Sequence, residues 1–256
     1  MPRQHSRASR ARQTDFGFRE VDENEKMLLV REVFDHVARR YDLMNDLMSG
    51  GIHRRWKAEL IGRLKPRPGE ILLDIAGGTG DIARGFLGRA GKSGRAFVCD
   101  INASMVTAGR DRALDDGILG GITWLVGNAE ELPVGDAGVD CCTIAFGLRN
   151  VTHKQKALEE ARRVLKPGGR FFCLEFSRVE APLLRRLYDL YSFAVLPRLG
   201  AVVAHDRDAY QYLVESIRRF PPQTELAAMM TGAGFEQVSW RNLSGGIAAI
   251  HSGWRL

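Results

Sequence analysis

The residues whose types and spacing could carry chemistry lie between Glu70 and Asp100. An apolar run ending at Ile75 is followed at once by three glycines at positions 77, 78 and 80, and then by apolar residues at helical spacing. Strand, glycine turn and helix in this order form the nucleotide-binding corner of a doubly wound α/β domain. A second apolar strand over 95–99 ends in Asp100, where a carboxylate is placed to accept hydrogen bonds from a ribose. The stretch therefore predicts a ligand that contains a nucleoside.

The loop sequence alone does not distinguish a dinucleotide from S-adenosylmethionine, because 78–83 also fits the pattern G-x-G-x-x-G/A. A dinucleotide places its pyrophosphate at a helix N-terminus, where the helix dipole favours negative charge. Here Asp81 stands at that terminus and Asp74 ends the preceding strand, and two carboxylates would repel a pyrophosphate. The same two carboxylates suit the cationic amino acid end of S-adenosylmethionine. The charges near the loop therefore favour S-adenosylmethionine over a dinucleotide. A further interpretation, that Asp81 only caps its helix, fits either ligand.

Alternating apolar runs and helical patterns predict the elements that position this loop. Short glycine turns between them imply right-handed crossovers and a parallel sheet, hence an α/β fold of the Rossmann-like type. The expected strands are 71–75, 95–99, 122–126, 139–145 and 170–175, with two closing strands at 235–240 and 246–251. The expected helices include 24–49, 154–165, 209–220 and 224–230. Met105 is expected beside an adenine, and the polar loop that begins at Asn128 and Ala129 is suited to contact the adenine amino group.

Composition and charge indicate an ordinary globular chain. Its 256 residues are 45% hydrophobic and 27% charged, and no apolar run approaches the length of about 18 residues that a membrane span needs. The net charge is +6, but the first 12 residues carry four arginines and no acid, which leaves about +2 for the remainder. We expect this tail, 1–13, to be disordered; it lacks the apolar core of a secretory signal. Recruitment to an anionic membrane surface and a solvated tail without function both stay open.

The four cysteines all lie in expected strands and have no C-x-x-C spacing and no nearby histidine pair. We interpret them as buried thiols of a reducing cytosol rather than disulfides, zinc ligands or nucleophiles. The sequence shows no metal-ligand cluster.

The segment 182–204 interrupts the alternation of strands and helices. It is richer in apolar and aromatic residues than one helix face requires, yet Pro197 interrupts it. A lid over an apolar substrate, a membrane-surface element, a dimer contact and an inserted helix that completes the core remain open.

Six blocks of sequence closely resemble the ubiquinone/menaquinone biosynthesis C-methyltransferases. The similarity extends from about residue 14 to residue 256, and the combination of the two N-terminal blocks with F-G-L-R-N is specific. The blocks are Y-D-L-M-N-D-L-M-S at 41–49, G-I-H-R-R-W-K at 51–57, D-I-A-G-G-T-G-D at 74–81, F-G-L-R-N at 146–150, R-V-L-K-P-G-G at 163–169 and L-E-F-S at 174–177.

The resemblance implies a class I methyltransferase fold with seven strands, mostly parallel, and a reversed last strand. It also implies methyl transfer from S-adenosylmethionine to a ring carbon of a polyprenylated benzoquinol, a demethylmenaquinol, or both. We expect one domain over 14–256, with an N-terminal helical cap at 14–68, a core at 69–256 and a helical insertion or lid at 182–222. A cytoplasmic protein in peripheral contact with the membrane, as a homodimer or in a quinone-biosynthesis complex, would fit such a substrate.

The expected site follows from the residues and the resemblance together. The cofactor-binding set is Gly77, Gly78, Thr79, Gly80, Asp81, Asp100, Ile101, Met105, Asn128, Ala129 and Ala145. The family often has serine where this chain has Ala145, which removes one hydroxyl hydrogen bond.

The expected catalytic set is Arg149, Asn150, Tyr41 and His53. Arg149 would stabilise a phenolate or position a water, and Asn150 would orient the quinol, since ligands bind at the carboxyl ends of such strands. The resemblance makes Tyr41 a partner on the covering helix, and His53 is a weaker candidate for the base. The opposing interpretation is that Arg149 pairs with Asp46 or Glu175 as structure.

Two other classes of function compete with this prediction. A nucleic-acid methyltransferase would fit the basic tail, but the chain lacks an N-P-P-[YF]-like turn after the fourth strand and a cysteine in a loop. A scaffold that keeps the cofactor fold without activity is excluded only by an assay.

Overall fold

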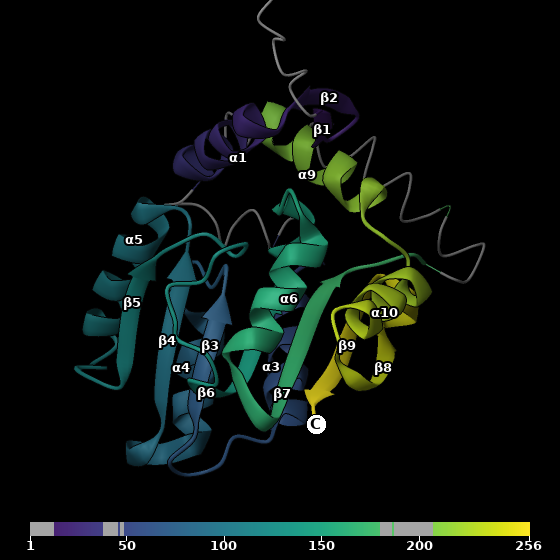
Figure 1. Ribbon diagram of the computed structural model, residues 1–256. Helices are drawn as coiled ribbons and strands as arrows, with labels where there is room; N and C mark the ends of the chain where they lie inside the picture. Colours follow the sequence, from purple (N-terminus) through teal and green to yellow (C-terminus); the bar gives the residue numbers. More distant parts are fainter. Residues whose placement is uncertain (1–12, 38–45, 47–48, 180–185, 187–206) are drawn as a thin grey trace, which may run out of the picture.

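A computed structural model describes residues 13–37, 46, 49–179, 186 and 207–256. Its centre is a seven-stranded sheet in the order β5-β4-β3-β6-β7-β9-β8 (Figure 1). The parallel strands are β3 (Ile71–Ile75), β4 (Arg95–Asp100), β5 (Ile122–Val126), β6 (Val139–Ala145) and β7 (Leu165–Phe176). Strand β9 (Ala248–Arg255) runs antiparallel to both β7 and β8 (Glu236–Leu243). The predicted mostly parallel sheet with a reversed last strand is confirmed.

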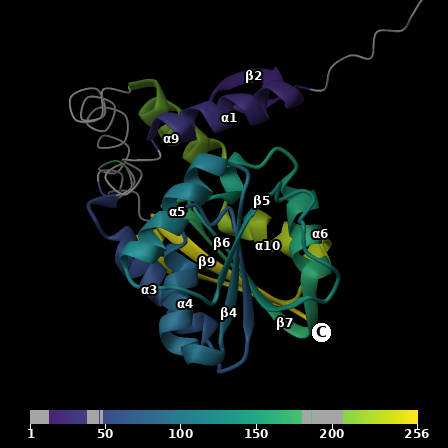
Figure 2. The same ribbon diagram turned by 90° about the vertical axis from the view of Figure 1, so that its left-hand side faces the viewer.

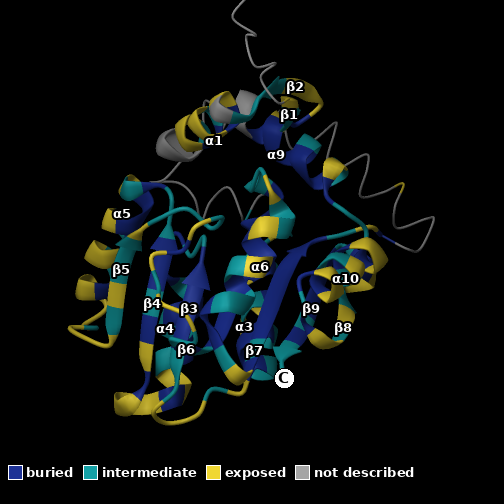
Figure 3. Cartoon of the chain, in the orientation of Figure 1, coloured by how far each residue is buried: buried dark blue, intermediate teal, exposed yellow. Residues whose placement is uncertain are grey.

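Helices cover both faces of the sheet. On one face lie α3 (His53–Leu64), α4 (Asp81–Ala90) and α5 (Ala103–Asp115), and on the other lie α6 (Lys154–Val164) and α10 (Gln223–Gly232), as Figure 2 shows. Short 3-10 turns η2 (Gly91–Ser93), η3 (Leu148–Asn150) and η6 (Ser244–Gly246) join some of these elements. Because the central strands are buried on both faces, they read as continuous apolar runs (Figure 3). All four cysteines are free and buried in this core, as predicted.

An N-terminal cap lies across the end of the sheet toward which the parallel strands point (Figure 1). It consists of a hairpin, β1 (Gln13–Phe16) and β2 (Arg19–Asp22), followed by α1 (Glu23–Val37), and it packs with α9 (Arg207–Arg219). The sequence analysis did not predict the hairpin. Its turn uses Gly17 at φ +60, a conformation that glycine adopts without steric cost.

The expected element bounds differ from those observed in several places. The helix expected over 24–49 is described only as α1, to Val37, and the fifth strand begins at Leu165 rather than at 170. The two closing strands are each longer than predicted. Gln13, the last residue of the expected disordered tail, lies in β1, and residues 1–12 lie outside the described residues. The segment 182–204, apart from residue 186, also lies outside them. The expected domain organisation stays a prediction. In the described part of the chain, no helix is long and apolar enough to cross a membrane.

Candidate functional site

Two adjoining cavities lie at the carboxyl ends of the parallel strands, beneath the cap. The main cavity, about 270 Å³, is lined by Glu23, Met27, Val30, Arg31, Ala76, Gly78, Asp100, Ile101, Asn102, Met105, Gly127, Asn128, Ala129, Glu130, Phe146, Gly147, Asn150, Val151, Thr152 and His153. The small cavity, about 20 Å³, is lined by Lys57, Asp74, Ala76, Gly77, Thr79, Asp81, Ile82 and Ala145. Ala76 lines both, so the two cavities meet at the start of the glycine loop.

Asp100 lies in the main cavity at the end of β4, where the sequence predicted a ribose acceptor. Its Oδ2 accepts a hydrogen bond from the Gly78 backbone N–H at 2.9 Å, and its Oδ1 accepts one from the Asn102 backbone N–H at 2.9 Å. Burial raises the pKa of this carboxyl, while the backbone donors oppose the rise. The two bonds fix the carboxylate against the glycine loop, with its oxygens available to hydroxyl donors from the cavity.

The glycine loop is closed so tightly that side chains would collide there. Gly80 is the N-cap residue of α4 and has φ +76, and a Cβ on it would lie 2.6 Å from the Trp124 ring. A Cβ on Gly77 would lie 2.9 Å from Asp74 Oδ2 and 2.9 Å from Val98. The glycines therefore allow the backbone to approach both its neighbours and a ligand.

The two carboxylates of the charge argument behave differently from each other. Asp81 is not a free charge, because it accepts from Lys57 Nζ at 2.6 Å and pairs with Arg84. Although burial acts to raise the pKa of Asp81, those two cations lower it to about 2. The assumption of two uncompensated carboxylates was therefore wrong for Asp81. No sequence pattern predicts that Lys57, 24 positions away, contacts that carboxylate.

Asp74 is buried at the end of β3 and faces the small cavity. Its Oδ1 accepts from Thr143 Oγ1 at 2.7 Å, whereas its Oδ2 has no hydrogen-bond partner in the described part of the chain. Burial raises the pKa of Asp74 to about 7, although the Thr143 hydrogen bond and Lys57 oppose it. An unpartnered carboxylate oxygen of this kind suits a cationic amino group.

The rest of the predicted cofactor set divides between the two cavities. Ile101, Met105, Asn128 and Ala129 line the main cavity, together with Gly78 and Asp100. Thr79, Asp81 and Ala145 line the small cavity with Gly77, while Gly80 lines neither and acts through the turn. The arrangement fits S-adenosylmethionine, with a nucleoside along the main cavity and its amino acid end toward Asp74.

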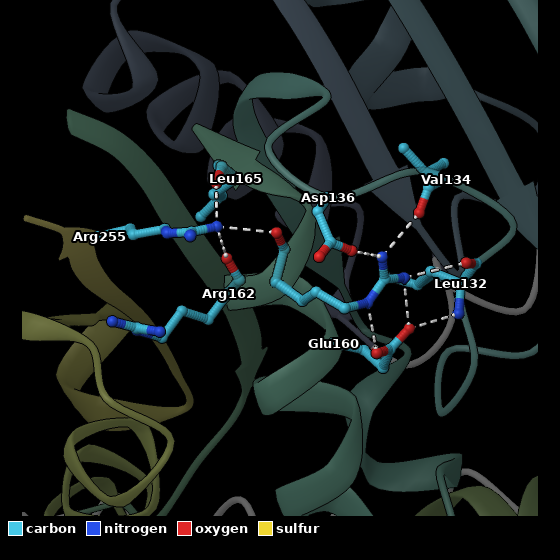
Figure 4. Close-up of polar contacts among 8 residues, drawn as sticks. Leu132, Val134, Asp136, Glu160, Arg162, Leu165 and Arg255 are labelled. Atoms are coloured by element: carbon cyan, nitrogen blue, oxygen red, sulfur yellow. Dashed lines mark hydrogen bonds and ion pairs between the residues drawn. The ribbon is translucent and has the colours of Figure 1, made fainter. Parts of the chain in front are cut away.

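A polar network around Arg163 and Glu160 fixes the loop that follows β5 (Figure 4). Arg163 donates to the carbonyl oxygens of Leu132 and Val134 at 3.2 and 3.0 Å, and Glu160 accepts from the Leu132 backbone N–H at 2.8 Å. Arg255 secures the same corner by donating to the Arg163 carbonyl at 2.8 Å. Within the loop, the Glu130 backbone N–H donates to Asn128 Oδ1 at 3.0 Å.

The predicted catalytic residues are not all brought together. Asn150 lines the main cavity, but Arg149 does not: its guanidinium is buried and donates to Glu175 Oε1 at 2.8 Å and to the Phe146 carbonyl. Arg149 is therefore paired with Glu175, as the opposing structural interpretation of this residue expected.

His53 lines neither cavity, and its Nδ1 lies 3.0 Å from Ser49 Oγ; burial lowers the pKa of its imidazole. Tyr41 lies outside the described residues. The catalytic roles of Arg149, Asn150, His53 and Tyr41 stay predictions.

Two functional candidates were missed by the sequence analysis. His153 lines the main cavity between two acids, with Nδ1 2.7 Å from Glu130 Oε2 and Nε2 3.2 Å from Glu23 Oε1. The other is Tyr212, which contacts Asn150 from α9. Neither belongs to a recognisable motif, and only the meeting of distant segments gives them a place at the site.

The chain is similar in sequence and in fold to known methyltransferases. The sequence model of the ubiE/COQ5 methyltransferase family matches residues 19–255. A ubiquinone/menaquinone biosynthesis C-methyltransferase UbiE from Acidiphilium cryptum is 59% identical over 242 residues, covering 94% of this chain and 96% of the relative. UbiE from Brucella abortus is 55% identical over 251 residues, covering 97% and 93%. A solved SAM-dependent methyltransferase from Aquifex aeolicus has a TM-score of 0.57 at 16% identity, over 78% of this chain and 89% of its own, and supports the fold alone.

Proposed function

The chain belongs to the ubiE/COQ5 methyltransferase family, and from that premise we propose that it methylates a ring carbon of a polyprenylated quinol in ubiquinone or menaquinone biosynthesis. The comparisons confirm the family, the class I methyltransferase fold and S-adenosylmethionine as methyl donor. The observation that carries the proposal is that one cavity extends from the nucleoside-binding loop to Asn150 and is covered by α1, through Met27 and Val30 and the charged Glu23 and Arg31.

The cofactor, when bound, supplies a methyl group already activated on a cationic sulfur. The chain's task is then chiefly to hold donor and acceptor in line. Asp100 would accept hydrogen bonds from the ribose hydroxyls, and Asp74 would face the amino group. Met105 and Ile101 would pack beside the adenine. The glycine loop brings backbone close to these groups because no side chain intervenes.

The acceptor would lie on the side of the main cavity formed by Phe146, Gly147 and Asn150. A ring carbon becomes nucleophilic when a neighbouring hydroxyl loses its proton, and it loses its own proton after the new carbon–carbon bond forms. Asn150 is positioned to hydrogen-bond a ring oxygen. Arg149 acts on a phenolate only if its pair with Glu175 opens; in the closed pair it fixes the Phe146 carbonyl and thus the wall of the cavity.

The roof of the cavity suits an apolar tail. Met27 and Val30 of α1 line the cavity, and Met27, Leu28 and Phe18 of the cap are exposed. We propose that a prenyl chain leaves the cavity past this surface and that the cap contacts the inner face of a membrane peripherally, in a cytoplasmic protein. Cosedimentation with anionic lipid vesicles tests this: Leu28→Asp should weaken binding, whereas Leu119→Asp, at an exposed leucine in the loop before β5, should not.

The reaction is tested with methyl-labelled S-adenosylmethionine and, in parallel, reduced demethylated benzoquinol and naphthoquinol. Label on a ring carbon is the expected result, and the two acceptors reveal the preferred head group. Asp100→Asn should weaken cofactor binding, with Asp111→Asn on the exposed side of α5 as control. Tight cofactor binding without label on either quinol would contradict the proposal and favour a nucleic-acid substrate or a scaffold. Whether the chain forms a homodimer or joins a larger complex is a separate prediction, which sedimentation would measure.

A further inference from the structure

The side chain of Asn150 is held by a tyrosine from a distant part of the chain. Tyr212 Oη donates to Asn150 Oδ1 at 3.0 Å, across 62 positions of sequence. Asn150 lines the main cavity, whereas Tyr212 is buried behind it. An amide carries its acceptor oxygen and its donor nitrogen on opposite branches. With the oxygen bound to Tyr212, the NH2 group is what Asn150 offers to a ligand, and it has no hydrogen-bond partner in the described part of the chain.

The hydroxyl of Tyr212 keeps its proton, and in the structure it donates that proton to Asn150 Oδ1. Burial raises the pKa of Tyr212 well above its usual value, and the negative charges of Asp15 and Glu175 act in the same direction. The positive charge of Arg149 opposes them. These charged groups come from β1, β7 and η3, while α1, which also packs against the ring, contributes the apolar Val30. Their balance leaves the phenol neutral.

The ring of Tyr212 has little freedom to move. It stacks on Phe16 with centroids 4.2 Å apart and planes 17° from parallel, and Val30 of α1 completes the cluster. The hairpin, α1 and α9 thus fix one hydroxyl against one amide.

We propose that Tyr212 is a positioning residue: it turns the amide NH2 of Asn150 toward an oxygen of the acceptor ring in the main cavity. This rests on the function proposed above. A donor aimed at that oxygen stabilises the phenolate, whose charge makes the neighbouring ring carbon nucleophilic. Tyr212 itself touches no substrate and acts only through Asn150.

The test compares wild type with Tyr212→Phe, which keeps the stacked ring and removes the hydroxyl. We expect the acidic limb of the pH–rate profile for quinol methylation to move to higher pH by about one unit, so that kcat near neutral pH falls about tenfold. The Kd for S-adenosylmethionine should not change. Ser216→Ala is the matched control: it removes another buried hydroxyl from α9, one that donates to the Leu213 carbonyl at 2.8 Å, and should leave the profile unchanged.

A double-variant cycle shows whether Tyr212 acts through Asn150. In an Asn150→Ala background, Tyr212→Phe should have no further effect on kcat, and an equal loss in both backgrounds would overturn the proposal. Asn150→Asp decides the matter if Tyr212→Phe does not fold, because it keeps an acceptor for Tyr212 and removes the donor. Wild-type kcat in Asn150→Asp overturns the inference, and a loss of at least tenfold supports it. If the wild-type protein transfers no label to either quinol, both the proposed function and this inference are contradicted. If the wild-type protein transfers label and Tyr212→Phe transfers it equally well, only this inference is contradicted.

Discussion

Arg149 Nη1 lies 2.8 Å from Glu175 Oε1, and both side chains are almost completely buried, at 1% and 2% exposure. The Arg149 backbone N–H also donates to Glu175 Oε2, at 3.3 Å. Burial raises the pKa of Glu175, and Arg149 opposes that rise. The pair joins the end of β7 to the turn that carries Asn150, so it is a structural element of the site.

Removing one member of this pair should destabilise the protein. For Arg149→Met we expect a loss of about 3–5 kcal/mol in the free energy of unfolding, because a buried carboxylate would lose its counter-charge. Urea denaturation measures it. The double variant Arg149→Met/Glu175→Gln should recover much of the loss. If the double variant regains stability and also activity, Arg149 has no role in the chemistry; stability without activity supports the predicted action on a phenolate.

Asp74 should make stability depend on pH in an unusual direction. The pKa of Asp74 is about 7 in the folded protein, compared with its ordinary value of 3.8. As pH rises, the unfolded chain therefore loses the Asp74 proton at a lower pH than the folded protein does. The contribution of Asp74 to stability therefore falls between those two pH values, by on the order of 4 kcal/mol, and stays low above them. Unfolding of wild type and Asp74→Asn at about pH 5 and about pH 8 measures the difference. A difference between the two proteins that does not change with pH would contradict the prediction.

His153 should hold α1 over the main cavity more firmly at low pH. The hydrogen bond with Glu130 raises the pKa of His153, as does Glu23 on α1. The contribution of His153 to stability is present at pH values below the pKa that the imidazole has in the unfolded chain. It is lost as pH rises through the higher pKa that the imidazole has in the folded protein. Since the side chain is 43% exposed, we expect no more than about 1 kcal/mol. Hydrogen exchange in α1, corrected for intrinsic rates, should show less protection at high pH in wild type, and His153→Gln should remove that pH dependence.

Gly80→Ala should damage the cofactor loop. The new Cβ would lie 2.6 Å from the Trp124 ring at a residue with φ +76, so we expect a loss of about 1–3 kcal/mol and weaker binding of S-adenosylmethionine. Gly88→Ala, in the same helix, meets no atom within 4 Å and should stabilise the protein by about 0.5–1 kcal/mol. Calorimetry and cofactor titration of both variants measure these effects. Equal behaviour of the two would show that the loop tolerates a side chain.

Much of the fold and of the cofactor site could be predicted because their signals are local. Buried parallel strands are continuous apolar runs, and the turn between β3 and α4 needs glycines within a few residues of one another. The placement of Asp100 follows from the same regularity, because parallel strands end at one edge of the sheet. The β1–β2 hairpin has no such signal, since its strands are four residues each, show no regular alternation, and bury Phe16 alone of their eight residues.

The sequence by itself determined the sheet, the glycine loop, the carboxylate after the second strand and, through contiguous motifs, the family. Only the tertiary structure decided which charges are compensated and which side chains meet: Lys57 with Asp81, Glu175 with Arg149, and Tyr212 with Asn150. The physical reason is that a strand or a turn is fixed by neighbours in the chain. A pKa or an amide orientation is fixed by neighbours in space, and here those come from 24, 26 and 62 positions away.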